Sequence, residues 1–184
     1  MNRKIIPVQE LPTIYLKPGE IHFGREAARV ITVLGSCISV IMYYRHKRIG
    51  AICHAVMPSY IKTIKKRPSS KDMFQFVDSS MKWMLAQFEK IGIARGDLDV
   101  KIFGGSEIFY DNKKYDSSLS VGKKNIEAAM KTIQEQDLKL KAWNVGGNKG
   151  RKVIFYTDTG EVFTKFVNKV EPQVVALYTL GSEK

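Results

Sequence analysis

Cysteine and histidine are the residue types in this sequence that could supply a thiol nucleophile and its base. The chain contains two cysteines, Cys37 and Cys53, and three histidines. An imidazole beside a thiol accepts its proton, and the resulting imidazolium stabilises the thiolate. The first question is therefore which cysteine the fold can bring to a histidine.

Cys37 and Cys53 lie on two apolar segments that we expect to pair as a hairpin. Segment 30–44 is rich in β-branched and aromatic residues and reads as a buried strand, kinked or bulged at Gly35. A polar tip, 45–48, follows. Segment 49–57 then returns as a second strand, which Pro58 stops.

The expected pairing brings Cys37, not Cys53, to His54. A four-residue loop places Ser39 opposite His54 in an antiparallel pair. Cys37 is then a diagonal neighbour of His54 on the same face, roughly 7–8 Å away at the backbone, a gap that side chains can close. Cys53 points to the opposite face because strand residues alternate.

The residues before Cys37 favour a sharp turn. Backbone N–H groups at Ser36 and Cys37 could there point at an oxyanion that develops on a substrate. The alternative is that Cys37 is a buried, inert thiol and that His54 has only a structural role.

No CxxC or HxxxH spacing indicates a metal site. Segment 146–151, GGNKGR, could cradle a phosphate, but it lacks the established phosphate-binding patterns and favours a tight turn between strands.

The rest of the chain predicts further strands and two helices. Pro18–Gly19 separates two short extended pieces within 14–23. Apolar residues recur at helical spacing over 73–88, with Ser70 as N-cap and Gly92 beyond the end, and over 125–134. Strands are expected at 100–103, 140–145, 152–157 and 162–167. The order is β-rich with two helices, which indicates a mixed α/β (α+β) fold.

Composition places the chain among ordinary globular proteins. Its 184 residues predict a single domain over 1–184, with 44% hydrophobic and 26% charged residues. No apolar run is long enough for a membrane-spanning helix, and no signal peptide is visible. Two cysteines are too few for a disulfide framework and favour a reducing cytoplasm. The net charge of +12 fits an acidic partner, whether nucleic acid, anionic lipid or protein.

Several motifs together resemble the CheD family of chemoreceptor glutamine deamidases. The resemblance covers roughly residues 14–167. It rests on Lys17–Glu20 (KPGE), Ile31–Cys37 (ITVLGSC), Gly50–His54 (GAICH), Lys101–Ser106 (KIFGGS), Val121–Gly122 with Asn125, Val145–Arg151 (VGGNKGR) and Asp158–Gly160 (DTG).

The resemblance implies a site and a fold. The family hydrolyses glutamine side chains of methyl-accepting chemotaxis receptors to glutamate, using a Cys–His–Thr triad without metal or organic cofactor. Cys37 matches the nucleophile and His54 the base. Thr32 matches the threonine in some members, whereas others place it one residue earlier, where this chain has Ile31. The implied fold is a three-layered α/β/β sandwich.

The resemblance also implies partners. They are the cytoplasmic helices of receptors and, in some members, a CheC-type phosphatase; the basic loop Lys62–Arg67 is a candidate receptor contact. One alternative is a non-catalytic chemotaxis adaptor that binds receptor or CheC, which loss of the third triad group would favour. Another is a nucleic-acid-binding domain, which charge alone supports, because no recognition motif accompanies it.

Overall fold

The computed structural model describes residues 11–60, 72–107 and 120–167, which form nine strands and two α-helices. The strands are β1 (Thr13–Tyr15), β2 (Ile21–Gly24), β3 (Arg29–Leu34), β4 (Ile38–Tyr44), β5 (Ile49–Cys53), β6 (Asp99–Gly104), β7 (Lys139–Val145), β8 (Gly150–Tyr156) and β9 (Val162–Val167). The helices are α1 (Val77–Lys90) and α2 (Val121–Glu135), with short 3₁₀ turns at Asp72–Gln75 and Arg95–Asp97. No helix among these residues is long and apolar enough to cross a membrane.

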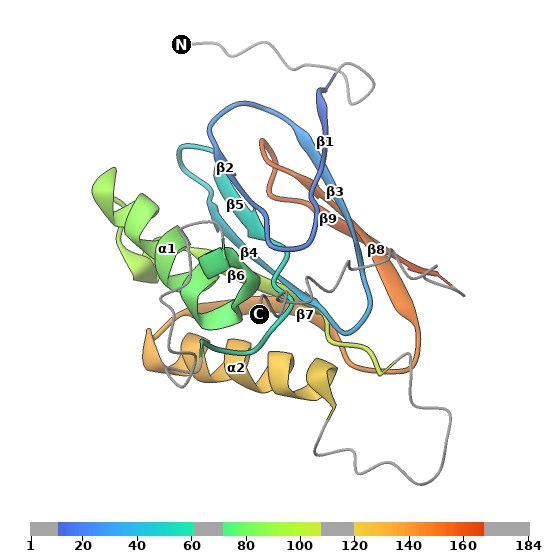
Figure 1. Cartoon of the computed structure of the whole chain (residues 1–184). Coiled ribbons are helices and arrows are strands. Elements are labelled where there is room, and N and C mark those ends of the chain that lie inside the picture. Colours follow the sequence, from blue (N-terminus) through green and yellow to red (C-terminus); the bar gives the residue numbers. More distant parts are fainter. Residues whose placement is uncertain (1–10, 61–71, 108–119, 168–184) are drawn as a thin grey trace, which may run out of the picture.

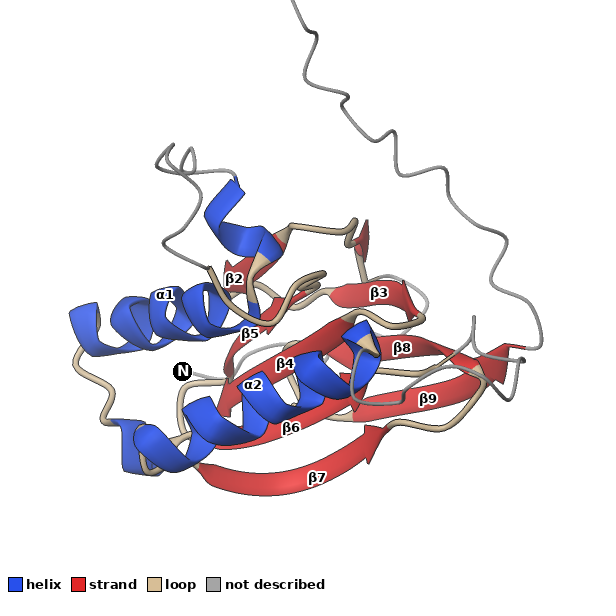
Figure 2. Ribbon diagram, turned by 60° about the horizontal axis from the view of Figure 1, so that its bottom comes forward, coloured by secondary structure: helices blue, strands red, loops and turns tan. Residues whose placement is uncertain are grey.

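The elements stack in three layers, as the α/β/β expectation requires. The middle layer is a five-stranded sheet in the order β2-β5-β4-β6-β7, and the second sheet has the order β1-β3-β8-β9. Helices α1 and α2 cover one face of the five-stranded sheet, and the four-stranded sheet covers the other (Figures 1 and 2). Each interface holds its own apolar core.

Strands β4 and β5 are apolar along almost their whole length, with Ser39 as the exception, because both of their faces are buried. Alternate residues of β4 enter different cores: Val40 and Met42 pack toward the helices, whereas Ile41 and Tyr43 pack between the sheets. A strand covered on both sides is expected to read as a continuous hydrophobic run. This explains why the sequence of 30–44 shows no polar alternation.

The prediction of one bent strand over 30–44 is wrong. The chain forms two strands, β3 and β4, that belong to different sheets. Leu34 at the end of β3 pairs with Arg151, whereas Ile38 at the start of β4 pairs with Gly104. The three residues between them carry the chain from one layer to the next, so the place where a bulge was predicted is a crossover between sheets.

The predicted hairpin register is confirmed. Tyr44 pairs with Ile49, and the same register continues to the bridge between Ile38 and Ala55. The second strand is shorter than predicted, because regular pairing ends at Cys53. The chain beyond it keeps only isolated bridges at Ala55 and Met57.

Both helices begin elsewhere than predicted. Helix α1 begins at Val77 rather than near Met73, because residues Asp72–Gln75 form a separate 3₁₀ turn. Ser70 lies outside the described residues. Helix α2 begins earlier than predicted, at Val121, where the Ser120 side chain accepts a hydrogen bond from Lys123 N at 3.3 Å. The four remaining strand predictions are confirmed within one or two residues.

Candidate functional site

The structure places Cys37 and His54 at the same end of the hairpin. Ile38 and Ala55 exchange two backbone hydrogen bonds of 2.9 and 2.8 Å, and Cys37 and His54 each immediately precede one of these residues. Cys37 is partly exposed, whereas His54 is only 3% exposed. Cys53 is buried in the core under the helices, on the opposite face of the sheet, as the strand period requires.

Thr32 is the hydroxyl that meets His54. Its Oγ1 lies 2.8 Å from His54 Nδ1. Thr32 is on the same face of β3 as Val30 and Leu34, which point between the sheets. Ile31 is therefore on the other face of β3. Of the two positions left open by the sequence, Thr32 is the one whose side chain lies beside the imidazole.

Hydrogen bonding assigns the tautomer of His54. The single Thr32 hydroxyl hydrogen points to Leu16 O, its acceptor at 2.9 Å. Thr32 Oγ1 must then accept from His54 Nδ1, which also lies 3.5 Å from Leu16 O. A neutral imidazole carries one N–H, so Nε2 is the basic nitrogen. Nε2 is buried and has no hydrogen-bond partner among the described residues.

The turn at Pro18–Gly19 fixes the backbone of His54. Gly19 N donates to His54 O at 2.8 Å, and His54 N donates to Glu20 O at 3.0 Å. Gly19 has a φ of +77°, which glycine adopts without strain. The KPGE segment thus has a structural role: it holds the histidine after strand β5 has ended.

Burial keeps both the thiol and the imidazole neutral. It raises the pKa of the Cys37 thiol from 9.0 to about 11, against a smaller opposing effect of the Cys37 backbone N–H. It lowers the pKa of His54 from 6.5 to about 4, against the opposing effects of the Leu16 carbonyl and Glu20. The pair at neutral pH is therefore thiol and imidazole rather than thiolate and imidazolium.

Three consecutive carbonyls hold the turn that carries Cys37. Gly35 O accepts from Ser106 N at 2.8 Å, and Cys37 O accepts from Gly105 N at 2.7 Å. Ser36 O accepts from the side chain of Asn125 at 2.9 Å. All three peptide planes are therefore fixed from the side of β6 and α2. The sequence motifs FGGS and VG…N are explained by these hydrogen bonds to the Cys37 turn.

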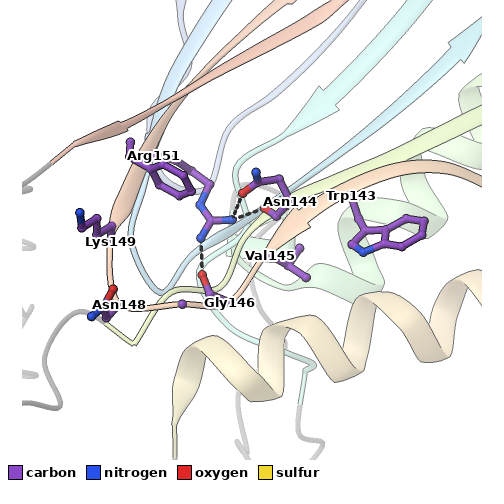
Figure 3. Close-up of a pocket in the computed structure, with 9 residues that line it drawn as sticks. Trp143, Asn144, Val145, Gly146, Asn148, Lys149 and Arg151 are labelled. Atoms are coloured by element: carbon purple, nitrogen blue, oxygen red, sulfur yellow. Dashed lines mark hydrogen bonds between the residues drawn. The ribbon is translucent and has the colours of Figure 1, made fainter.

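Arg151, the last residue of the GGNKGR motif, braces the neighbouring turn, a role that the sequence did not indicate. It is 1% exposed, and its guanidinium donates to Asn144 O, to Asn144 Oδ1 at 2.5 Å and to Gly146 O (Figure 3). It also donates to Ser106 Oγ at 2.9 Å and stands over the Phe166 ring at 5.6 Å. Through Ser106, this buried cation is connected to the Cys37 turn.

A pocket of about 420 Å³ lies beside this arginine rather than at Cys37. It is lined by the β7–β8 turn and its flanks: Trp143, Asn144, Val145, Gly146, Gly147, Asn148, Lys149, Arg151 and Phe166 (Figure 3). The predicted tight turn at 146–151 is confirmed. Two strand spacings, roughly 10 Å, separate this end of β7 from the start of β4 in the five-stranded sheet.

The described residues contain no group of three or more side chains that could hold a metal ion. The groups that this end of the hairpin offers are the Cys37 thiol, the His54 imidazole with the Thr32 hydroxyl at its Nδ1, and the backbone amides of the Cys37 turn. Such a set suits acyl transfer through a covalent thioester, since it supplies a nucleophile, a base and hydrogen-bond donors.

Comparisons with known proteins find similar chains whose names describe a glutamine deamidase. A family model described as "CheD chemotactic sensory transduction" matches residues 57–166. A "Probable chemoreceptor glutamine deamidase CheD 2" of Geobacter sulfurreducens is 42% identical over 162 residues, 88% of this chain and 94% of the relative. A "Probable chemoreceptor glutamine deamidase CheD" of Maridesulfovibrio salexigens is 32% identical (87% and 95% covered), and one of Methanococcus vannielii is 31% identical (85% and 96% covered).

Proposed function

This chain belongs to the CheD family, and we propose that it is a chemoreceptor glutamine deamidase that uses Cys37, His54 and Thr32 as its catalytic triad. The substrate is the side-chain amide of selected receptor glutamines, which is hydrolysed to a carboxylate with release of ammonia. The observation that carries the mechanism is the hydrogen bond between Thr32 Oγ1 and His54 Nδ1, which leaves Nε2 as the base.

The first step forms the thioester. Cys37 Sγ attacks the glutamine Cδ while its proton passes to His54 Nε2, so that no free thiolate is needed beforehand. The substrate carbonyl becomes an oxyanion, which accepts hydrogen bonds from the N–H groups of Ser36 and Cys37. The fixed carbonyls of the same turn keep these N–H groups in place.

The second half of the reaction releases the products. The C–N bond breaks, and the leaving nitrogen takes the proton from His54 and departs as ammonia. Water then loses a proton to His54 Nε2 and attacks the thioester. The C–S bond breaks, the proton returns to Cys37 Sγ, and glutamate remains on the receptor. No metal or organic cofactor takes part in these steps.

Thr32 orients the imidazole in both halves. Its hydroxyl accepts from Nδ1–H and donates to Leu16 O, so Nδ1 keeps its hydrogen while Nε2 takes up and releases the proton. The observation that would favour a non-catalytic adaptor, loss of the hydroxyl beside His54, is not found. Binding to a CheC-type phosphatase stays a prediction. We place the reaction in the cytoplasm, where receptor glutamines and reduced thiols coexist. The predicted receptor contact at Lys62–Arg67 lies outside the described residues and stays a prediction.

Mass spectrometry of a receptor cytoplasmic fragment tests the proposal. Incubation with the unmodified protein is expected to add about 1 Da at specific glutamines, whereas Cys37→Ala adds nothing. Cys53→Ala is the matched control, because it removes the other thiol from the opposite face and should keep the activity. No mass shift across several receptors from the same cell, or a shift that Cys37→Ala preserves, would refute the deamidase.

A further inference from the structure

Asn125 interrupts the apolar face of helix α2. The inward-facing residues of this helix are Gly122, Asn125, Ala129, Thr132 and Ile133. Asn125 is fully buried, at 0% exposure. A buried amide in a helix face that otherwise packs against a sheet breaks the local pattern, and such breaks concentrate at functional positions.

Both hydrogens of the Asn125 amide are directed at backbone carbonyls of the site. Nδ2 donates to Ser36 O and to Val56 O, each at 2.9 Å. Ser36 immediately precedes the nucleophile, and Val56 follows the His54–Ala55 pair. One side chain therefore connects the segment that carries Cys37 with the segment that carries His54. Its orientation is fixed, because only the nitrogen of an amide side chain can donate to two carbonyls.

Asn125 replaces a backbone ladder that ends at this point. The last hydrogen-bonded pair between the two segments is Ile38 with Ala55. Beyond it, Val56 N and Met57 N both donate to Gln75 O, at 2.8 and 2.9 Å, so they are not available to Ser36. Beyond the Ile38–Ala55 pair, on the side where Cys37 lies, the two segments are thus connected by the Asn125 side chain instead of by the sheet.

Packing alone does not account for this residue. Asn125 Oδ1 is buried and has no hydrogen-bond partner among the described residues. A buried acceptor without a partner is unfavourable by about 1–3 kcal/mol. Asn125 therefore leaves its Oδ1 without a hydrogen bond while its Nδ2 holds the carbonyls of Ser36 and Val56, which lie next to the reacting groups.

We propose that Asn125 is a positioning residue that sets the distance and orientation between Cys37 Sγ and His54 Nε2. It acts through the peptide carbonyls of Ser36 and Val56 and does not touch substrate. This inference rests on the proposed function, since it concerns the thiol and base of that reaction. The turn keeps its bonds to Gly105 N and Ser106 N when Asn125 is removed, so a folded protein with a loosened turn is expected.

The test compares Asn125→Ala with Thr132→Ala. Thr132 is a buried polar residue of the same helix whose hydroxyl donates to Ala128 O, one turn earlier in that helix, at 2.9 Å. We expect Asn125→Ala to lower kcat for deamidation about 10- to 100-fold with little change in KM, because small misplacements of reacting groups have effects of this size. Thr132→Ala should keep kcat once the folded fraction is matched by circular dichroism.

A second readout is independent of any receptor. In a Cys53→Ala background, Cys37 is the only thiol, and its rate of alkylation by iodoacetamide can be followed between pH 5 and 8. We expect Asn125→Ala to lower this rate toward that of His54→Gln, and the double variant to react no more slowly than His54→Gln alone. Asn125→Ser, which retains one donor, should fall between Asn125→Ala and the parent protein and serves if Asn125→Ala does not fold.

The outcomes separate the two proposals. Three results would overturn the positioning role. They are an alkylation rate that Asn125→Ala leaves unchanged, effects of Asn125→Ala and His54→Gln that add in the double variant, and an equal loss of rate in Thr132→Ala. A parent protein that deamidates no receptor fragment, while its thiol reactivity depends on Asn125 and His54, would refute the proposed function and leave the positioning role standing.

Discussion

His54 makes the folded protein sensitive to acid. Its folded pKa is about 4 and its unfolded pKa is 6.5, so the unfolded chain binds more protons between these values. Stability is therefore full above about pH 6.5 and is lost as the pH falls through about 4. The size of the effect is about 3 kcal/mol, given 1.36 kcal/mol for each pKa unit. Urea unfolding at a series of pH values measures it.

The control for this prediction is His54→Gln. The variant should lose a large part of the pH dependence between 4 and 6.5, although burial also lowers the pKa of His22 and leaves a residual slope of the same sign. A variant with the same acid sensitivity as the parent protein would show that His54 is not the group that titrates.

Thr32 permits a substitution that separates its hydroxyl from its volume. Thr32→Val keeps the branched shape between the sheets but removes the acceptor for His54 Nδ1, which is then left with only Leu16 O at 3.5 Å. We expect kcat to fall about 10²-fold with little change in KM, because an imidazole that is no longer fixed transfers protons from a poorer geometry. Steady-state deamidation of a receptor fragment measures both constants.

Thr32→Ser is the matched restoration, since it returns the hydroxyl without the methyl group. It should recover most of the kcat that Thr32→Val loses. Equal losses in Thr32→Val and Thr32→Ser would assign the residue to packing instead of to the orientation of His54.

At the scale of elements, the contact between β6 and the Cys37 turn depends on a glycine. Gly104 has a φ of +111°, and a Cβ there would lie 2.2 Å from Cys37 O. Gly104→Ala must therefore strain its own backbone and displace the turn that carries Cys37. We expect it to lower the free energy of unfolding by about 3–5 kcal/mol and to abolish most of the activity.

Gly147→Ala is a suitable comparison for Gly104→Ala. Gly147 also has a positive φ, +75°, but no atom lies within 4 Å of the position of its Cβ. Its replacement should lower stability by only about 1–2 kcal/mol, from backbone strain alone. Similar destabilisation in both variants, measured by urea unfolding, would contradict the close approach of β6 to Cys37.

The sequence predicts the hairpin but not the crossover before it. The register follows from the loop length, so the selection of Cys37 over Cys53 could be made without a structure. The apolar run 30–44 hides the change of sheet, because β3 and β4 are both buried and share one composition. For the same reason the sequence could not choose between Ile31 and Thr32. Asn125 is part of a sequence motif, but the motif does not indicate its role, because its amide contacts residues 69 and 89 positions away, which no local pattern encodes.

At the scale of the whole molecule, the net charge of +12 should affect the rate of association with the receptor and not the rate of the chemical steps. Surface charges raise association rates with an oppositely charged partner, and salt screens them over a Debye length of about 10 Å at 0.1 M. The proposed catalytic groups, Cys37 and His54, are both neutral before substrate binds, because burial raises the pKa of the thiol and lowers the pKa of the imidazole. Raising the salt from about 0.03 to 0.3 M should therefore raise KM for an acidic receptor fragment, on the order of 10-fold, and leave kcat unchanged.

A short neutral peptide that carries the same glutamine distinguishes this effect from general inhibition by salt. The peptide lacks the acidic surface, so its kcat/KM should be low but independent of salt. The kcat/KM of the receptor fragment should be higher at low salt and should fall toward that of the peptide as the salt rises. Equal salt dependence for both substrates would place the effect at the site and not at encounter. Addition of duplex DNA is a further test. If the positive charge of this chain is used to bind nucleic acid, the protein should bind the DNA with a steep salt dependence, and the bound DNA should inhibit receptor deamidation in proportion to the fraction of protein bound. If DNA binds only weakly and does not compete with the receptor fragment, the positive charge of this chain serves receptor binding. Turnover on a receptor requires fast release as well as fast encounter, which an association driven by surface charge permits.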